Sequence, residues 1–332
     1  MNACDLPAGL TVFARRVRSP DVVGIVIVGS ADPTYFEMAI RAVLVSWIAA
    51  FAVAGCARDG AEPPLMSYAD YPQAVHLVPY VLSHERAGSR GALLYYGSRH
   101  TYDPADPQVA EIQSLWESFR PTLALNEGGS PPAATSVAAA MKFGEAGLVR
   151  YLAQRDGVPV ESLEPSVQIE FGRALNAGYS PTTVKVFWAM RFYVSYRRAN
   201  PGASAEEFMA RALNQNTGHS VLDGPPTDLS DFARAYAALF PEFPDWKSMP
   251  DEYLDPASSA TVLNLISCEV SIARDEHMVR LIADAVQRGE RVFAVVGASH
   301  VVIQESKLAW RLSGLSIRPA DARFPRAKKT VP

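Results

Sequence analysis

Residues 92–100 read Ala-Leu-Leu-Tyr-Tyr-Gly-Ser-Arg-His, and residues 292–300 read Val-Phe-Ala-Val-Val-Gly-Ala-Ser-His. In each stretch a short apolar run ends at a glycine, and a histidine follows three residues later. Such a run, rich in β-branched or aromatic side chains and closed by a glycine turn, is typical of a buried strand. Open α/β sheets bind ligands beyond the carboxyl ends of their strands. We therefore expect His100 and His300 to belong to one site.

Between and around these two stretches, runs of strand length alternate with amphipathic runs of helix length. We predict strands at 123–125 and 158–163, helices at 109–120, 137–155, 260–288 and 301–312, and a largely helical insertion at about 166–258. Alternation of this kind favours an α/β fold with a mainly parallel central sheet flanked by helices. One such domain is expected to span residues 68–320.

The composition of the 332 residues is that of a globular protein. Hydrophobic residues make up 48% and charged residues 20%, which excludes a disordered chain. The net charge of −4 and the lack of a long basic run argue against a nucleic-acid partner.

The residues before the expected domain resemble a targeting signal. Residues 38–55 contain a short basic segment at Arg41 and an apolar stretch, and residues 53–56 read Val-Ala-Gly-Cys, like a bacterial lipobox. This predicts a lipoprotein signal peptide, a lipidated Cys56 and a polar tether over 56–67. The alternatives are a single membrane anchor or a buried helix.

Two further expectations follow from this segment. Residues 1–37 fit poorly before a signal peptide, since they carry several acidic residues, and we interpret them as a gene-call extension. The apolar run at 22–28 could otherwise be a strand. Because Ala57 and not aspartate follows the cysteine, a Gram-negative host would place the protein in the cell envelope, on the outer membrane facing the periplasm.

Four predicted strand ends carry residues suited to chemistry. In a parallel sheet, His100, Glu127, Glu164 and His300 would gather at one edge. Two imidazoles and a carboxylate can bind a divalent metal that activates water, or one histidine can act as a general base without metal. The plainer alternatives are turn residues bonded to the backbone and, for Glu164, the cap of the next helix.

The long helix at 260–288 carries Arg274 and Asp275. Arg274 could bind an anionic substrate group or orient Glu127, or it could simply pair with Asp275 or Glu276 at the surface. Arg99, inside the first motif, either lines the site or points to solvent. The remaining histidines show no metal-ligand spacing and are interpreted as structural or solvated: His76, His84, His219 and His277.

Taken together, these motifs resemble the TraB/PrgY/GumN/Tiki superfamily, which shares its fold with erythromycin-esterase-like and ChaN-like proteins. The residues that carry the resemblance are the two glycine–histidine motifs, Glu127, the segment 147–165, Arg274-Asp275-x-x-Met278 and their order in the chain. The resemblance implies a hydrolase site in which His100, Glu127 and His300 bind a divalent metal or act as bases, with Arg274 as electrostatic partner. Ser98-Arg99 and Ser299 depart from the usual pattern, which leaves metal and substrate open.

Two hypotheses follow. The first is a membrane-anchored hydrolase of peptide or ester bonds that uses manganese, cobalt, zinc or iron, or a histidine-activated water. The second is a non-catalytic, ChaN-like lipoprotein that binds haem or another ligand through the same histidines. Substrate and oligomeric state are not indicated by the residues.

Overall fold

The computed structural model describes residues 12–16, 23–27, 61–85, 91–214, 222–313 and 317–319. The chain divides into two compact units, Met1–Ala61 and Glu62–Pro332. In the first unit, β1 (Val12–Arg16) pairs antiparallel with β2 (Val23–Ile27), so the apolar run at 22–28 does contain a strand. The predicted signal peptide and Cys56 lie outside the described residues. Across the described part of the chain, no helix has both the length and the apolar character needed to cross a membrane.

The second unit alternates strands and helices. Its strands are β3 (Tyr80–Glu85), β4 (Ala92–Ser98), β5 (Leu123–Asn126), β6 (Val160–Ser162), β7 (Arg291–Gly297) and β8 (Ile317–Pro319). Its helices are α2 (Pro107–Phe119), α3 (Val137–Ala140), α4 (Gly144–Asp156), α5 (Val167–Asn176), α6 (Pro181–Ala199), α7 (Ala205–Asn214), α8 (Leu229–Leu239), α9 (Val262–Gln287) and α10 (Ala298–Arg311).

The strands form one sheet in the order β6-β5-β7-β4-β3-β8. The pairs β6–β5, β5–β7 and β7–β4 are parallel, which confirms the mainly parallel α/β fold. Because β4 and β7 are neighbours with Ser98 opposite Gly297, the two glycine–histidine motifs lie side by side. The antiparallel strand β3, which lies between β4 and β8, was not predicted.

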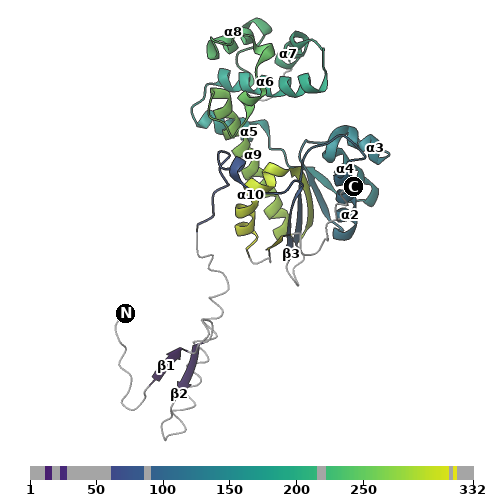
Figure 1. Ribbon diagram of the computed structural model, residues 1–332, viewed down its shortest axis with the longest axis vertical. Helices are drawn as coiled ribbons and strands as arrows, with labels where there is room; N and C mark the ends of the chain where they lie inside the picture. Colours follow the sequence, from purple (N-terminus) through teal and green to yellow (C-terminus); the bar gives the residue numbers. More distant parts are fainter. Residues whose placement is uncertain are drawn as a thin grey trace, which may run out of the picture. The chain divides into compact units, whose positions relative to one another are not determined.

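Helices cover both faces of the sheet (Figure 1). On one face α2 and α4 pack through Trp116 and Leu148, and on the other α9 and α10 pack through Ile282 and Val301. Every residue of β4 is buried, which explains why its sequence is a continuous apolar run and not an alternating one.

Helix α9 belongs to two cores at once. Leu263 and Ile266, near its start, pack in the core of the helical insertion formed by α5–α8. Met278 and Ile282, further along, pack in the core beneath the sheet. Arg274 therefore lies where the insertion meets the sheet, as Figure 1 shows for α9 itself.

Two helix predictions need correction. The single helix predicted at 137–155 is interrupted by a 3-10 turn, Met141–Phe143, because the backbone at Gly144 takes a positive φ of 62° before α4 begins. The last helix begins at Ala298 and not at 301, directly after β7, so His300 lies in the first turn of α10 and not in a loop.

Candidate functional site

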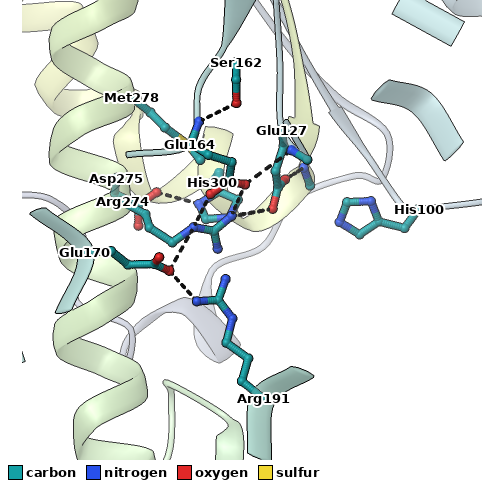
Figure 2. Close-up of polar contacts among 12 residues, drawn as sticks. His100, Glu127, Ser162, Glu164, Glu170, Arg191, Arg274, Asp275, Met278 and His300 are labelled. Carbon is teal, nitrogen blue, oxygen red and sulfur yellow. Dashed lines mark hydrogen bonds and ion pairs between the residues drawn. The ribbon is translucent and has the colours of Figure 1, made fainter. Parts of the chain in front are cut away.

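Most of the predicted site residues lie close together at the carboxyl edge of the sheet, and His100 lies slightly apart from the others. Figure 2 shows Glu127, Glu164, Arg274 and His300 linked by polar contacts, while the ring of His100 faces them from the side. The parallel arrangement of β4, β5, β6 and β7 is what brings these residues together, since each strand ends at the same edge.

Glu127 follows β5 and lies at the centre of the cluster. Its Oε2 accepts a hydrogen bond from the Gly297 backbone N–H at 2.8 Å, and its Oε1 accepts one from Arg274 Nη2 at 3.0 Å. The same Oε1 is 3.4 Å from His300 Nε2. Burial by itself raises the pKa of Glu127, but His300, Arg274 and the Gly297 N–H outweigh it and hold that pKa well below its ordinary value. Glu127 is therefore ionised at neutral pH.

His300 lies between two carboxylates. Its Nδ1–H donates to Asp275 Oδ1 at 2.6 Å, and its Nε2 faces Glu127. Burial lowers the pKa of His300, yet Asp275 and Glu127 overcome that effect and raise the pKa to about 10. In this arrangement His300 is an imidazolium at neutral pH, which makes it an electrostatic group and not a base.

Asp275 is the fully buried partner that orients His300. Besides the imidazole, it accepts hydrogen bonds from Tyr68 Oη and Gln304 Nε2, each at 2.6 Å. Gln304 is in turn held by the hydroxyl of Tyr95 at 2.9 Å. Because Asp275 is held by two further donors, and Gln304 is itself fixed by Tyr95, the position of the His300 ring is well defined.

Arg274 makes no surface ion pair with Asp275 or Glu276, which was the plainer alternative. Its guanidinium binds Glu164 through two bonds, Nη2 to Oε1 at 2.7 Å and Nε to Oε2 at 3.1 Å, in addition to Glu127. Only 9% of Arg274 is exposed. These contacts fit the role of orienting Glu127 and leave few donors for a substrate.

The same ion network reaches into the helical insertion. Glu170 on α5 lies 4.0 Å from Arg274 Nε and also pairs with Arg191 on α6 (Figure 2). Glu164 is not the cap of α5, since Ser166 holds that position. The helical insertion therefore contributes the charged side chains of Glu170 and Arg191 to the ion network of the site.

His100 is the exposed member of the set, with 62% of its side chain accessible. Its backbone takes a φ of 52°, a left-handed conformation that is strained for any residue except glycine. Its Nδ1 lies 3.5 Å from Oε2 of the buried Glu145, and this carboxylate raises the pKa of His100 above its ordinary value.

Sequence reasoning missed Glu145. The side chain stands in the first turn of α4, where its Oε1 accepts hydrogen bonds from the Thr101 N–H at 2.7 Å and from Gln108 Nε2 at 3.1 Å. A glutamate two residues before Gly147 carries no motif of its own, because its pairing with His100 arises only when α4 packs on the sheet. Tyr68 and Gln304 were missed for the same reason.

Arg99 does not contact the cluster. Its Nη2 binds both carboxylate oxygens of Asp106, at 2.8 and 2.7 Å, and half of its side chain is exposed. Asp106 also caps α2, so the pair closes the loop between β4 and that helix. This outcome corresponds to the solvent-facing alternative for Arg99.

Of the three residues predicted to bind metal, Glu127 and His300 lie next to each other and His100 lies apart from them. Glu127 Oε1 and His300 Nε2 lie side by side, and Asp275 holds the other imidazole nitrogen, as outer-shell carboxylates do for metal-binding histidines. His100 faces this pair from the opposite side. Within the described ranges, no group of three or more His, Cys, Asp or Glu side chains is arranged to hold a metal ion.

A cleft of about 650 Å³ lies between α5 and α9. Its lining includes Arg173, Glu269, His277 and Arg280, and none of the predicted catalytic or metal residues.

Comparison with known proteins adds no assignment: no family model, no curated protein and no solved structure matches this chain. The resemblance to the TraB/PrgY/GumN/Tiki superfamily thus stays a prediction, and the function rests on the geometry of the site.

Proposed function

We propose that this protein is a hydrolase of peptide or ester bonds in which His100 activates a water molecule at the carboxyl edge of the sheet. The observation that carries the proposal is the pairing of an exposed, strained histidine with the buried carboxylate of Glu145. A histidine held in this way has the accessibility and the orientation that a general base needs.

The roles divide between the two histidines because their environments differ. With Nδ1 directed at Glu145, the Nε2 of His100 is the nitrogen that accepts a proton from water. The imidazolium of His300 supplies fixed positive charge beside the reacting carbonyl, and Asp275 keeps it in place. Arg274 holds Glu127 and Glu164 in position.

In a second form of the same proposal, the hydrolase depends on a divalent metal ion. His100, Glu127 and His300 would hold it, and manganese, cobalt, zinc and iron are the candidates. When bound, such an ion lowers the pKa of a water ligand and polarises a carbonyl. The side-by-side donors of Glu127 and His300 support this form, and the separate position of His100 counts against a three-residue ligand set.

We also propose that Cys56 carries lipid and attaches the protein to a membrane of the cell envelope. Support comes from residues 53–56 and the apolar stretch before them. Mass spectrometry of the mature amino terminus tests this part: a lipid-modified Cys56 is expected, and an unmodified chain beginning at Met1 or Met38 would contradict it.

The hydrolase is tested with the full-length protein, purified without chelator and assayed on a panel of esters and peptides. We expect turnover by the wild type, loss of at least a hundredfold in His100→Ala, and a melting temperature within about 2 °C of the wild type. His76→Ala, a histidine outside the cluster, serves as the control and should keep full activity.

Metal analysis of the same samples separates the two forms. Stoichiometric metal that disappears in Glu127→Gln supports the metal form, whereas turnover that survives chelation supports the base form. Folded protein without turnover, combined with a Soret shift on haem addition that His100→Ala abolishes, would favour the non-catalytic, haem-binding alternative.

A further inference from the structure

Two short segments meet at the rim of the site. Residues 100–102 lie along residues 143–145, joined by two contacts: His100 Nδ1 and the Thr101 N–H both reach the Glu145 carboxylate. A Cβ placed on Gly144 would lie 3.5 Å from the Thr101 carbonyl oxygen and 3.7 Å from Tyr102 Cε1. The segment that carries the proposed base is thus held against the start of α4.

Two exposed aromatic residues belong to these two segments. Tyr102 is 72% exposed and Phe143 is 45% exposed, although both belong to residue types that usually bury most of their surface. Tyr102 is two residues after His100, and Phe143 is two residues before Glu145. Exposed rings scattered singly over a surface need no explanation, but two on adjoining segments, one carrying the candidate base and the other its carboxylate, offer apolar contact area where a substrate would bind.

The charges of the neighbouring cluster restrict what that substrate can be. Glu127, Glu145, Glu164, Glu170 and Asp275 supply five carboxylates, against the two guanidinium groups of Arg191 and Arg274. Carboxylates therefore outnumber arginines in this cluster, which disfavours an anionic substrate near the scissile bond.

We propose that Tyr102 and Phe143 form a subsite for an uncharged aromatic or large apolar side chain of the substrate, next to the carbonyl that is attacked. This inference rests on the proposed hydrolase and specifies its substrate class. Aromatic rings prefer offset or edge contacts with one another, so an aromatic substrate group gains most from this pair.

The test compares two substrates that differ only in this side chain, N-acetylphenylalanine methyl ester and N-acetylalanine methyl ester, with the full-length protein. We expect wild-type kcat/KM to favour the phenylalanine ester, and the ratio to fall about tenfold in Tyr102→Ala and in Phe143→Ala. Phe192→Ala is the matched control, since Phe192 on α6 is 47% exposed, and it should leave the ratio unchanged. An unchanged ratio in both rim variants would overturn the subsite.

A binding measurement separates failure of the subsite from failure of the hydrolase. Saturation-transfer NMR with N-acetylphenylalaninamide on the His100→Ala protein should show ring-proton contacts that Tyr102→Ala removes and Phe192→Ala keeps. Such binding without turnover of either ester by the wild type would reject the hydrolase and retain the subsite. Binding that survives Tyr102→Ala and Phe143→Ala together would reject the subsite whatever the activity.

Discussion

The imidazole of His100 lies on the backbone of Gly297: a Cβ at residue 297 would approach His100 Nε2 to 2.7 Å. The reverse contact also exists, because a Cβ on Gly97 would lie 2.8 Å from the Cα of Ala298 and 3.0 Å from Tyr80 O. Each glycine of the two motifs therefore makes room for the other motif. This reciprocal packing gives a structural reason for the occurrence of the same pattern on two neighbouring strands.

The first prediction concerns these two glycines. Gly297→Ala should displace only the end of an exposed side chain, so we expect loss of most turnover with a change in unfolding free energy below about 1 kcal/mol. Gly97→Ala meets backbone that cannot move away, and we expect it to destabilise the fold by about 1–3 kcal/mol. Urea unfolding and the ester assay measure both effects. Equal destabilisation by the two variants would show that the ring of His100 does not rest on Gly297.

The second prediction uses the backbone strain at His100. A left-handed φ costs about 1 kcal/mol for a residue with a Cβ, so His100→Gly should be more stable than His100→Ala by roughly that amount. Both variants should lack turnover. Arg120, with a φ of 51° at the end of α2, provides the control. Arg120→Gly should show the same advantage over Arg120→Ala and keep full activity. If the two substitutions at residue 100 prove equally stable, the strain is absent in solution.

The third prediction concerns the ion network. Arg274→Met removes the shared partner of Glu127 and Glu164 and leaves buried carboxylates uncompensated, which should cost about 3–5 kcal/mol of unfolding free energy. Arg173→Met is the comparison, because Arg173 pairs with Glu269 at 2.6 Å but is 39% exposed, and its loss should cost less than about 1 kcal/mol. A similar cost for both arginines in chemical denaturation would mean that burial does not set the strength of the network.

The fourth prediction is a dependence of stability on pH. His84 on β3 is fully buried, and neither ring nitrogen has a hydrogen-bond partner in the described part of the chain. Burial lowers the pKa of His84 from 6.5 to about 4. Between these values the unfolded chain binds a proton that the folded chain does not, so stability should fall as the pH decreases from about 6.5 to 4.

His84→Leu tests that dependence. The variant should raise stability at neutral pH, since it removes two unpaired polar atoms, and it should flatten the decline between pH 6.5 and 4. Thermal unfolding at half-unit pH intervals measures both. His76→Leu, at a partly exposed position, should leave the slope as in the wild type. An identical acid slope in His84→Leu would place the responsible group elsewhere.

Much of the fold could be predicted because the signals are local. The apolar runs that become β4 and β7 are buried on both faces and therefore continuous, and Asp106-Pro107 starts α2 as an N-cap followed by proline should. Strand β3 escaped prediction, since His84 and Ser83 interrupt its apolar pattern. The break before Gly144 escaped because the small residues of this segment are compatible with a continuous helix.

The candidate site also has features that could be predicted from the sequence and features that could not. Glu127, Glu164 and His300 were predictable as neighbours, together with His100, since the ends of parallel strands meet at one edge, and Arg274 was predictable only as a candidate partner of Glu127. The pairing of the side chains could not be predicted, because hydrogen bonds such as the one between His300 and Asp275 depend on how α9 and α10 are rotated about their axes. Glu145 offered no signal at all, as its partner is 45 positions away and on another element.

By itself, the sequence determined the elements and their alternation, the parallel sheet that follows from them and the edge where reactive side chains gather. Hydrophobic periodicity, caps and glycines act within a few residues, so they can be interpreted without knowing the fold. Only the tertiary structure decided that His300 is an imidazolium between Asp275 and Glu127, and that His100 stands apart with Glu145. The state of an ionisable group is set by burial and by charges a few ångströms away in space, and these distances exist only once the helices are packed on the sheet.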